Sequence, residues 1–135
     1  MDEHKFLSKY SFITRIVKQI NNTYQNNCFD ATAVLLRRLF EITIILVYRN
    51  LHLDHDIKEP TGNYLQLNDL IAKLGSDTRI NVSRIKASYP LFQKIGNYSA
   101  HKIEYNASRK DIDDIRIDYR TALEELFHKG NLFAA

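Results

Sequence analysis

The residues from Lys94 to His101 combine side chains that could hold a phosphate group and transfer a proton. They read Lys-Ile-Gly-Asn-Tyr-Ser-Ala-His. At about 100° per residue on a helical wheel, Asn97 and His101 fall within roughly 60° of Lys94. Tyr105 falls in the same sector, with Tyr98 alongside. A cation can hold a phosphate, and an imidazole, whose reference pKa is about 6.5, can act as an acid or a base at neutral pH. The segment therefore predicts a phosphate-handling surface on one helix face.

The same residues have a second interpretation that involves no chemistry. Gly96, followed by Asn97-Tyr98-Ser99, is also typical of the end of one helix and the cap of the next. His101 would then be a hydrogen-bonded residue near a helix junction. The spacing alone leaves both interpretations open.

Positive charge is concentrated in the segment from Arg79 to Lys110, although the net charge of the chain is only +3. Glu104 is the only acid in this segment, and aromatic residues are interleaved with the basic ones. This pattern is typical of surfaces on which cations contact RNA phosphates and rings stack on bases, although a solvated helix face can look the same. We expect Tyr98, Lys102 and Tyr105 to contact RNA. The basic residues are Arg79, Arg84, Lys86, Lys94, Lys102, Arg109 and Lys110.

The elements that position these residues are expected to be helices within one domain spanning residues 1–135. Glycine and proline number only 4 and 2, and apolar residues recur at helical spacing. We predict an all-α, up-and-down bundle of about four or five helices. The expected helices cover about residues 5–21, 31–50, 68–74 and 108–128. A further helix starts near Asn81 or Ser83, with a kink or break at Pro90.

The expected helix from Ala31 to Asn50, with Asp30 as its N-cap, is apolar nearly all round and should therefore be central. Glu41 lies four residues after Arg37 and three after Arg38. An isolated carboxylate would be costly in so apolar a helix, so we predict that Glu41 pairs with one of these arginines. This pair could extend to the region of Asn97.

Neither a membrane span nor a metal or cofactor site is expected. The most apolar run, residues 39–48, is shorter than the roughly 20 residues that cross a bilayer. His52, Asp54, His55 and Asp56 could bind a divalent metal, but no further ligand set has zinc spacing, so a polar loop is preferred. Cys28 is the single cysteine, which predicts a reducing, cytoplasmic location and a small apolar filler.

Three segments in this order resemble the HEPN superfamily of helical domains (higher eukaryotes and prokaryotes nucleotide-binding), and most closely an uncharacterised bacterial branch. Residues 37–41 (Arg-Arg-Leu-Phe-Glu) are similar to its Arg-Arg-x-x-Glu motif on a central helix. Residues 67–71 (Leu-Asn-Asp-Leu-Ile) are similar to its short helix before the motif helix. Residues 95–101 (Ile-Gly-Asn-Tyr-Ser-Ala-His) are similar to its Gly-Asn-x-x-Ala-His motif.

The resemblance implies an RNA-associated function and two alternatives within it. Catalytic members cleave RNA without metal, through an arginine and a histidine that meet a second copy of themselves in a dimer. His101 matches that histidine, whereas the cation six intervening residues upstream is Lys94. Lysine keeps the charge but lacks the planar fork of arginine. The first alternative is an endoribonuclease of a toxin or anti-phage system, with Lys94, Asn97 and His101 as catalytic residues and Arg37, Arg38 and Glu41 as supporting ones.

The second alternative is a non-catalytic helical module that dimerises, binds RNA or nucleotide, or docks a partner. The resemblance implies a homodimer, with a monomer that serves as a subunit of another assembly as the alternative. A cognate antitoxin or accessory protein is a further candidate partner. The sequence does not choose between cleavage and binding.

Overall fold

Five α-helices make up most of the computed structural model, which describes residues 1–83, 85–102 and 104–134. α1 (Ser11–Gln25) and α2 (Phe29–Asn50) are followed by a 3₁₀ helix, η1 (Asp54–Ile57), and by α3 (Leu67–Ser76). A second 3₁₀ helix, η2 (Lys86–Ser88), leads directly into α4 (Tyr89–His101), and α5 (Arg109–Gly130) comes last. Apart from two isolated bridges, no β-structure occurs in these described ranges. The predicted all-α helical bundle is confirmed.

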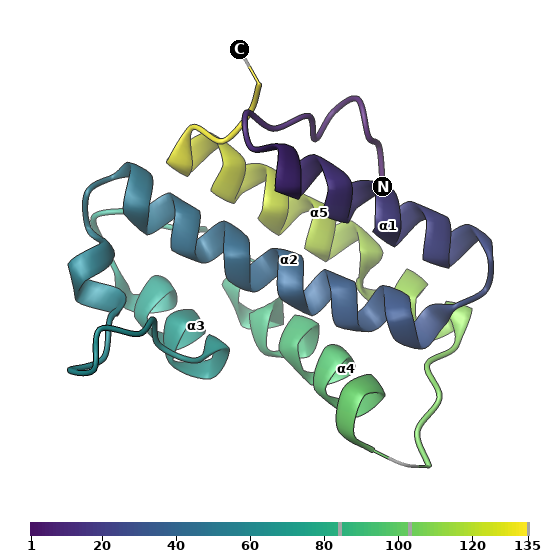
Figure 1. The fold of residues 1–135 in the computed structure, drawn as a ribbon. Coiled ribbons are helices and arrows are strands. Elements are labelled where there is room, and N and C mark those ends of the chain that lie inside the picture. Colours follow the sequence, from purple (N-terminus) through teal and green to yellow (C-terminus); the bar gives the residue numbers. More distant parts are fainter. Residues whose placement is uncertain (84, 103, 135) are drawn as a thin grey trace.

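α2 occupies the centre of the bundle and packs against α1, α3, α4 and α5 (Figure 1). Its position follows from its sequence, because a helix that is apolar on nearly every side needs neighbours on several sides. Phe40 of α2 lies between the other helices, with its ring centroid 5.1 Å from that of Tyr89 and 5.2 Å from that of Phe92. Tyr119 of α5 completes this aromatic group at 6.2 Å. The prediction of a central second helix is confirmed.

The residues before α1 pack against the residues after α5, on one side of the molecule (Figure 1). Phe6 is fully buried, and its ring meets that of Phe127 edge-on at a centroid distance of 5.5 Å. The Ser8 hydroxyl donates a hydrogen bond to the Leu132 carbonyl at 2.7 Å. We call this arrangement the terminal clasp.

α1 begins six residues later than the sequence predicted, at Ser11 instead of about Lys5. The apolar spacing of Phe6 suits a helix, but Phe6 is buried against α5 from a non-helical segment. The carboxylate of Asp2 accepts hydrogen bonds from the backbone amides of His4 and Lys5, at 2.9 and 3.2 Å, and so holds that segment in a turn.

The prediction that Asp30 caps α2 is wrong, because α2 begins at Phe29 with Cys28 at the N-cap. Asp30 Oδ1 instead accepts a hydrogen bond of 2.7 Å from the backbone amide of Ala107, and so fastens the segment before α5 to α2. Cys28 is exposed, so its interpretation as an apolar filler is also wrong. The contact between Asp30 and Ala107 could not be recognised from neighbouring residues, since the two residues are far apart in the sequence.

Pro90 starts a helix instead of breaking one. It lies in the first turn of α4, where its missing amide hydrogen has no partner to lose and its fixed φ suits the helix. α3 runs through Gly75 to Ser76 and is longer than predicted. α5 begins with a capping box, in which Ser108 Oγ accepts a hydrogen bond from the Asp111 amide and the Asp111 carboxylate accepts one from the Ser108 amide.

Among the described residues, no helix is both long enough and apolar enough to cross a membrane.

Candidate functional site

α4 is a continuous helix across the segment in which the sequence allowed either one helix or a junction. It runs from Tyr89 to His101 without interruption, so the interpretation of Gly96 as a helix end is wrong. Tyr89, Phe92, Ile95 and Gly96 form its buried face. Of the predicted chemical groups, Lys94 and His101 are exposed, whereas Asn97 and Tyr98 are partly buried.

Gly96 sets how closely α4 approaches α2. A β-carbon at Gly96 would lie 2.5 Å from Arg37 Cβ and 3.0 Å from the Ala33 carbonyl oxygen, which is closer than carbon atoms pack. Only glycine therefore allows this crossing. The consequence for the site is that the residue after it, Asn97, is carried directly beside Arg37.

The three sequence segments that resemble HEPN motifs meet in one pocket between α2, α3 and α4. Arg37 and Glu41 come from the first segment, Asn68 from the second and Asn97 from the third, with Gln93 beside them. These five residues, which we call the motif pocket, line a hollow of about 390 Å³ together with residues 64–67. The three segments are separate in the sequence, and residues from each line one pocket in the structure.

The predicted pairing of Glu41 is confirmed with Arg37, at 3.7 Å between Nη1 and Oε2. Both side chains are about one-third exposed, which agrees with the expected partial burial. Within the described residues, the buried Nε of Arg37 has no hydrogen-bond partner. The motif pocket therefore combines the ion pair of Arg37 and Glu41 with the amides of Asn68, Gln93 and Asn97.

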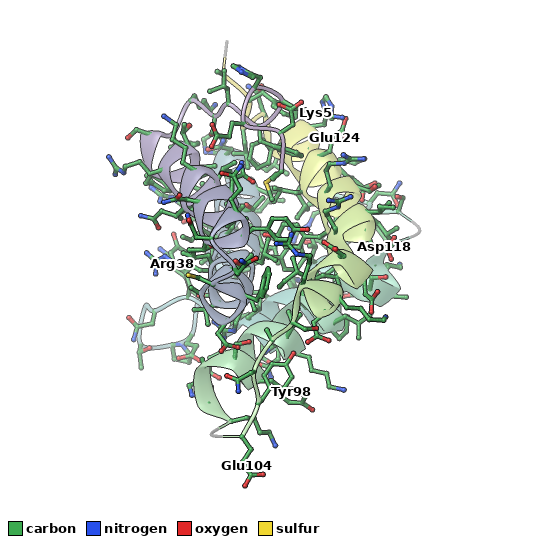
Figure 2. The ribbon with its side chains drawn as sticks, turned by 90° about the vertical axis from the view of Figure 1, so that its right-hand side faces the viewer. Lys5, Arg38, Tyr98, Glu104, Asp118 and Glu124 are labelled. Carbon is green, nitrogen blue, oxygen red and sulfur yellow. The ribbon has the colours of Figure 1, made fainter. Side chains whose placement is uncertain are left out.

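Arg38 lies apart from the motif pocket. It lines a shallow hollow between α1 and α2 that also contains Arg15 and Arg49. In Figure 2 it lies at the left edge, far from Tyr98 near the lower end. Arg38 forms no ion pair within the described residues, so Arg37 is the arginine of this motif that supports the pocket.

A strip of two lysines, two tyrosines and a histidine runs along the C-terminal half of α4 and into the segment that follows this helix, since Lys102 and Tyr105 come after its last residue. Lys94 Nζ lies 5.4 Å from the centre of the Tyr98 ring, and Lys102 Nζ lies 5.2 Å from it. The Tyr105 ring meets Tyr98 edge-on at 5.6 Å. We call Lys94, Tyr98, His101, Lys102 and Tyr105 the lysine strip. It joins two cations to two aromatic rings on an open surface.

His101 is the last residue of α4 and is exposed to solvent. It accepts or donates no side-chain hydrogen bond and forms no ion pair within the described residues. Lys94 is likewise exposed, and the helix rise of about 1.5 Å per residue separates the two α-carbons by about 10 Å along the axis. His101 and Lys94 therefore share one open face, while Asn97 lines the motif pocket beside them.

Most other basic residues of the predicted RNA-binding segment contact other residues of the same chain. Arg79 bonds to Asp56 at 2.7 Å and to Asp77 at 2.8 Å, and Asp77 also accepts a hydrogen bond of 2.9 Å from the Tyr48 hydroxyl. We call these four residues the arginine cluster. Lys86 bonds to the Gly75 carbonyl and Lys110 to Asp114, while Arg109 lies over the rings of Tyr24 and Phe29. Arg84 lies outside the described residues.

The contacts within the arginine cluster stabilise the charged form of Asp77 and the neutral form of Tyr48. The Arg79 guanidinium, followed by the Tyr48 hydroxyl, holds the pKa of Asp77 well below its usual range against the opposing effect of burial. Burial, followed by the hydrogen bond to Asp77, raises the pKa of the Tyr48 phenol. The Arg79 guanidinium therefore has two carboxylate partners within the protein, while its side chain remains 43% exposed.

The loop with two histidines and two aspartates is a short 3₁₀ helix whose carboxylates are used in ion pairs. Asp54 lies 3.7 Å from Lys58, and Asp56 contacts both Arg79 and His55. The described residues contain no group of three or more histidine, cysteine or acidic side chains arranged to hold a metal ion.

Comparison with protein-family models, with curated proteins and with solved structures found no match to this chain. Its function is therefore argued from its own residues.

Proposed function

We propose that this chain is an RNA-associated domain of the HEPN type that binds single-stranded RNA through the lysine strip. One observation carries the proposal: Lys94 Nζ and Lys102 Nζ lie 5.4 and 5.2 Å from the centre of the Tyr98 ring, and His101, three residues after Tyr98, is exposed. Lysines contact backbone phosphates without regard to sequence, and an accessible aromatic ring stacks on an unpaired base. Arg79, Lys86 and Lys110 have partners within the chain, whereas Lys94 and Lys102 have no carboxylate partner among the described residues. This difference favours the strip as the site of phosphate contact.

The reaction that we propose is metal-independent cleavage of the RNA backbone. The ribose 2′-oxygen bonds to the neighbouring phosphorus as its proton passes to a base. The bond from phosphorus to the 5′-oxygen breaks, and an acid protonates that oxygen. The products are a 2′,3′-cyclic phosphate and a 5′-hydroxyl, so no cofactor is consumed. His101 supplies the imidazole, Lys94 stabilises the charge on the phosphate, and Asn97 orients the reacting groups from the adjacent motif pocket.

The complete reaction uses two proton-transferring groups, whereas the lysine strip contains one imidazole. We propose that a second copy of the chain supplies the other, so that two His101 side chains meet across a two-fold axis. A homodimer is the expected state, and light scattering at micromolar concentration measures it. A strict monomer would remove this composite mechanism while leaving RNA binding intact.

Incubation with total RNA, with and without EDTA, tests the cleavage proposal. The wild type should cleave equally well in both, and His101→Ala should be about 100- to 10,000-fold slower, the typical loss for one acid–base group. His4→Ala, which removes another exposed histidine, is the matched control and should retain full activity. Lys94→Arg should keep or raise activity, because a guanidinium fork grips phosphate better than an ammonium does.

A non-catalytic RNA-binding or partner-docking module is the second candidate function. One observation favours it: within the described residues, no hydrogen bond fixes the orientation of the His101 ring. If the wild type leaves RNA intact, or cleaves it no faster than His101→Ala does, this second function is the better one. In either case we propose a toxin or anti-phage setting, with a cognate antitoxin or accessory protein as partner.

A further inference from the structure

A second hollow lies between α1, α2 and α5. Its volume is about 240 Å³. Ile20 of α1, Leu36 of α2, and Ile112 and Tyr119 of α5 form its floor, and all four are buried. An apolar cavity of about 150 Å³ is large enough to bind benzene, so this one can hold a single ring with substituents or a short alkyl chain.

The polar groups of the floor are already satisfied within the protein. The Tyr119 hydroxyl donates a hydrogen bond of 2.7 Å to the Leu36 carbonyl. The buried Thr32 hydroxyl lies 2.8 Å from that of Thr23 and 3.0 Å from the Cys28 carbonyl. The floor therefore offers apolar surface, and the part of a ligand that rests on it must be apolar.

The mouth of the cavity carries an unbalanced pair of cations. Arg116 and Arg120 lie one turn apart on α5, both are exposed, and neither has an ion-pair partner among the described residues. Like charges at this spacing destabilise a helix, whereas Lys110 and Asp114, at the same spacing on α5, form an ion pair. An anion held between the two guanidinium groups would remove the repulsion.

The N-terminal segment forms the remaining wall. Asn21 holds it with two hydrogen bonds of 2.7 Å, one accepted from the Met1 amino group and one donated to the Met1 carbonyl. Asp2 is the one acid among the lining residues, and its carboxylate accepts hydrogen bonds from the amides of His4 and Lys5. The mouth therefore keeps an excess of positive charge above an apolar floor.

We propose that this cavity binds a small amphipathic anion, with a single carboxylate or similar head group between Arg116 and Arg120 and a short alkyl chain or single ring on the floor. Guanidinium groups grip such a head group with paired hydrogen bonds, and the floor excludes water from the apolar body. The site is separate from the lysine strip and does not depend on the RNA function.

Titration of the full chain with octanoate and with octan-1-ol, followed by NMR, tests this proposal. The two probes share the apolar chain and differ in the charged head. Octanoate should bind about tenfold more tightly, with shifts centred on Leu36, Ile112 and Tyr119. In the double variant Arg116→Gln/Arg120→Gln this preference should disappear while octan-1-ol binds as before. The matched control Arg15→Gln/Arg49→Gln, which removes two arginines from the hollow between α1 and α2, should keep the preference.

Equal binding of the two probes would overturn the proposal. A preference for octanoate that survives the loss of Arg116 and Arg120, or octanoate shifts that lie outside the cavity, would do the same. Sedimentation with vesicles containing an anionic phospholipid separates a free ligand from a membrane surface. Binding to vesicles without binding of free octanoate would assign the two arginines to a lipid surface and would also overturn it. Ile20→Phe, which fills the floor, should block both probes, and its thermal unfolding shows whether it remains folded.

Discussion

The arginine cluster and the lysine strip are built from the same kinds of groups and have opposite properties. In the arginine cluster, Arg79 is bonded to two carboxylates, and the aspartate that also meets Tyr48 is almost completely buried. In the lysine strip, Lys94 and Lys102 face a tyrosine ring and have no carboxylate partner among the described residues. Arg79 and the two lysines all lie in one segment of the sequence, residues 79–110, whose single acid is Glu104. The difference teaches that pairing, rather than the density of charge along a chain, decides which cations remain available for a ligand.

The largest effect on stability should come from breaking the arginine cluster. Asp77→Ala leaves the buried Tyr48 hydroxyl without an acceptor and removes a bidentate partner of Arg79, so we expect a loss of about 2–3 kcal/mol in the free energy of unfolding. Urea denaturation measures it. Asp114→Ala, which breaks the exposed pair with Lys110, is the matched control and should cost at most about 0.5 kcal/mol. Equal losses in the free energy of unfolding would mean that the arginine cluster contributes no more to stability than an exposed ion pair does.

The next effect should come from Gly96, which joins the strip to the core. Gly96→Ala forces α4 away from Arg37 and Ala33, an overpacking cost of about 1–3 kcal/mol that alanine's better helix propensity offsets by about 1 kcal/mol. We expect a net loss of up to about 2 kcal/mol in thermal or urea denaturation.

Gly75→Ala provides the control for that substitution. Gly75 also lies in a helix, but a β-carbon there would meet nothing within 4 Å. This variant should gain about 0.5–1 kcal/mol from helix propensity alone. If both variants change stability in the same direction, the close crossing of α2 and α4 is not what requires glycine at position 96.

The pH dependence of stability should also distinguish the two regions. The pKa of Asp77 is lowered in the folded protein, so the stability that it contributes is present above the unfolded value of about 3.9 and is lost as the pH falls below it. Asp77→Asn should therefore unfold with a smaller loss of stability between about pH 5 and pH 3 than the wild type. Lys94→Ala should follow the wild-type profile, and a parallel profile for Asp77→Asn would contradict the assignment.

The smallest effect on stability, and the most direct on function, should come from the strip itself. Lys94→Ala or Lys102→Ala should change the free energy of unfolding by less than about 0.5 kcal/mol. Each should reduce the salt dependence of single-stranded RNA binding by about 0.7 in the slope of log affinity against log salt, the amount for one lost phosphate contact. Fluorescence anisotropy across a salt series measures this slope. Lys129→Ala, an exposed lysine on α5, should leave it unchanged.

Local features of the fold could be predicted from the sequence, and distant partners could not. The cap at Ser108 and Asp111 depends on residues three apart, and the pairing of Arg37 with Glu41 on residues four apart, so both could be recognised in advance. Pro90 was expected to break a helix because nothing in its neighbourhood shows that the helix starts there. Phe6 was placed in α1 because its spacing fits, although its partner Phe127 belongs to α5.

The candidate site shows the same division. Lys94 and His101 were expected on one face because a single helix fixes their relation. The ion pair between Arg79 and Asp56 and the position of Gln93 in the motif pocket could not be predicted from the sequence, because both contacts join separate elements. A polar residue near a motif helix is too common a signal to have identified Gln93 beforehand.

The terminal clasp has a consequence for the order of events during synthesis. A ribosome releases the N-terminal residues first, yet the ring that covers Phe6 belongs to Phe127, near the end of α5. Throughout translation of the intervening helices, Phe6 therefore stays uncovered, and the bundle can close only after α5 has left the exit tunnel. A nascent chain that stalls before this point leaves an aromatic side chain uncovered, and exposed apolar surface of this kind promotes aggregation.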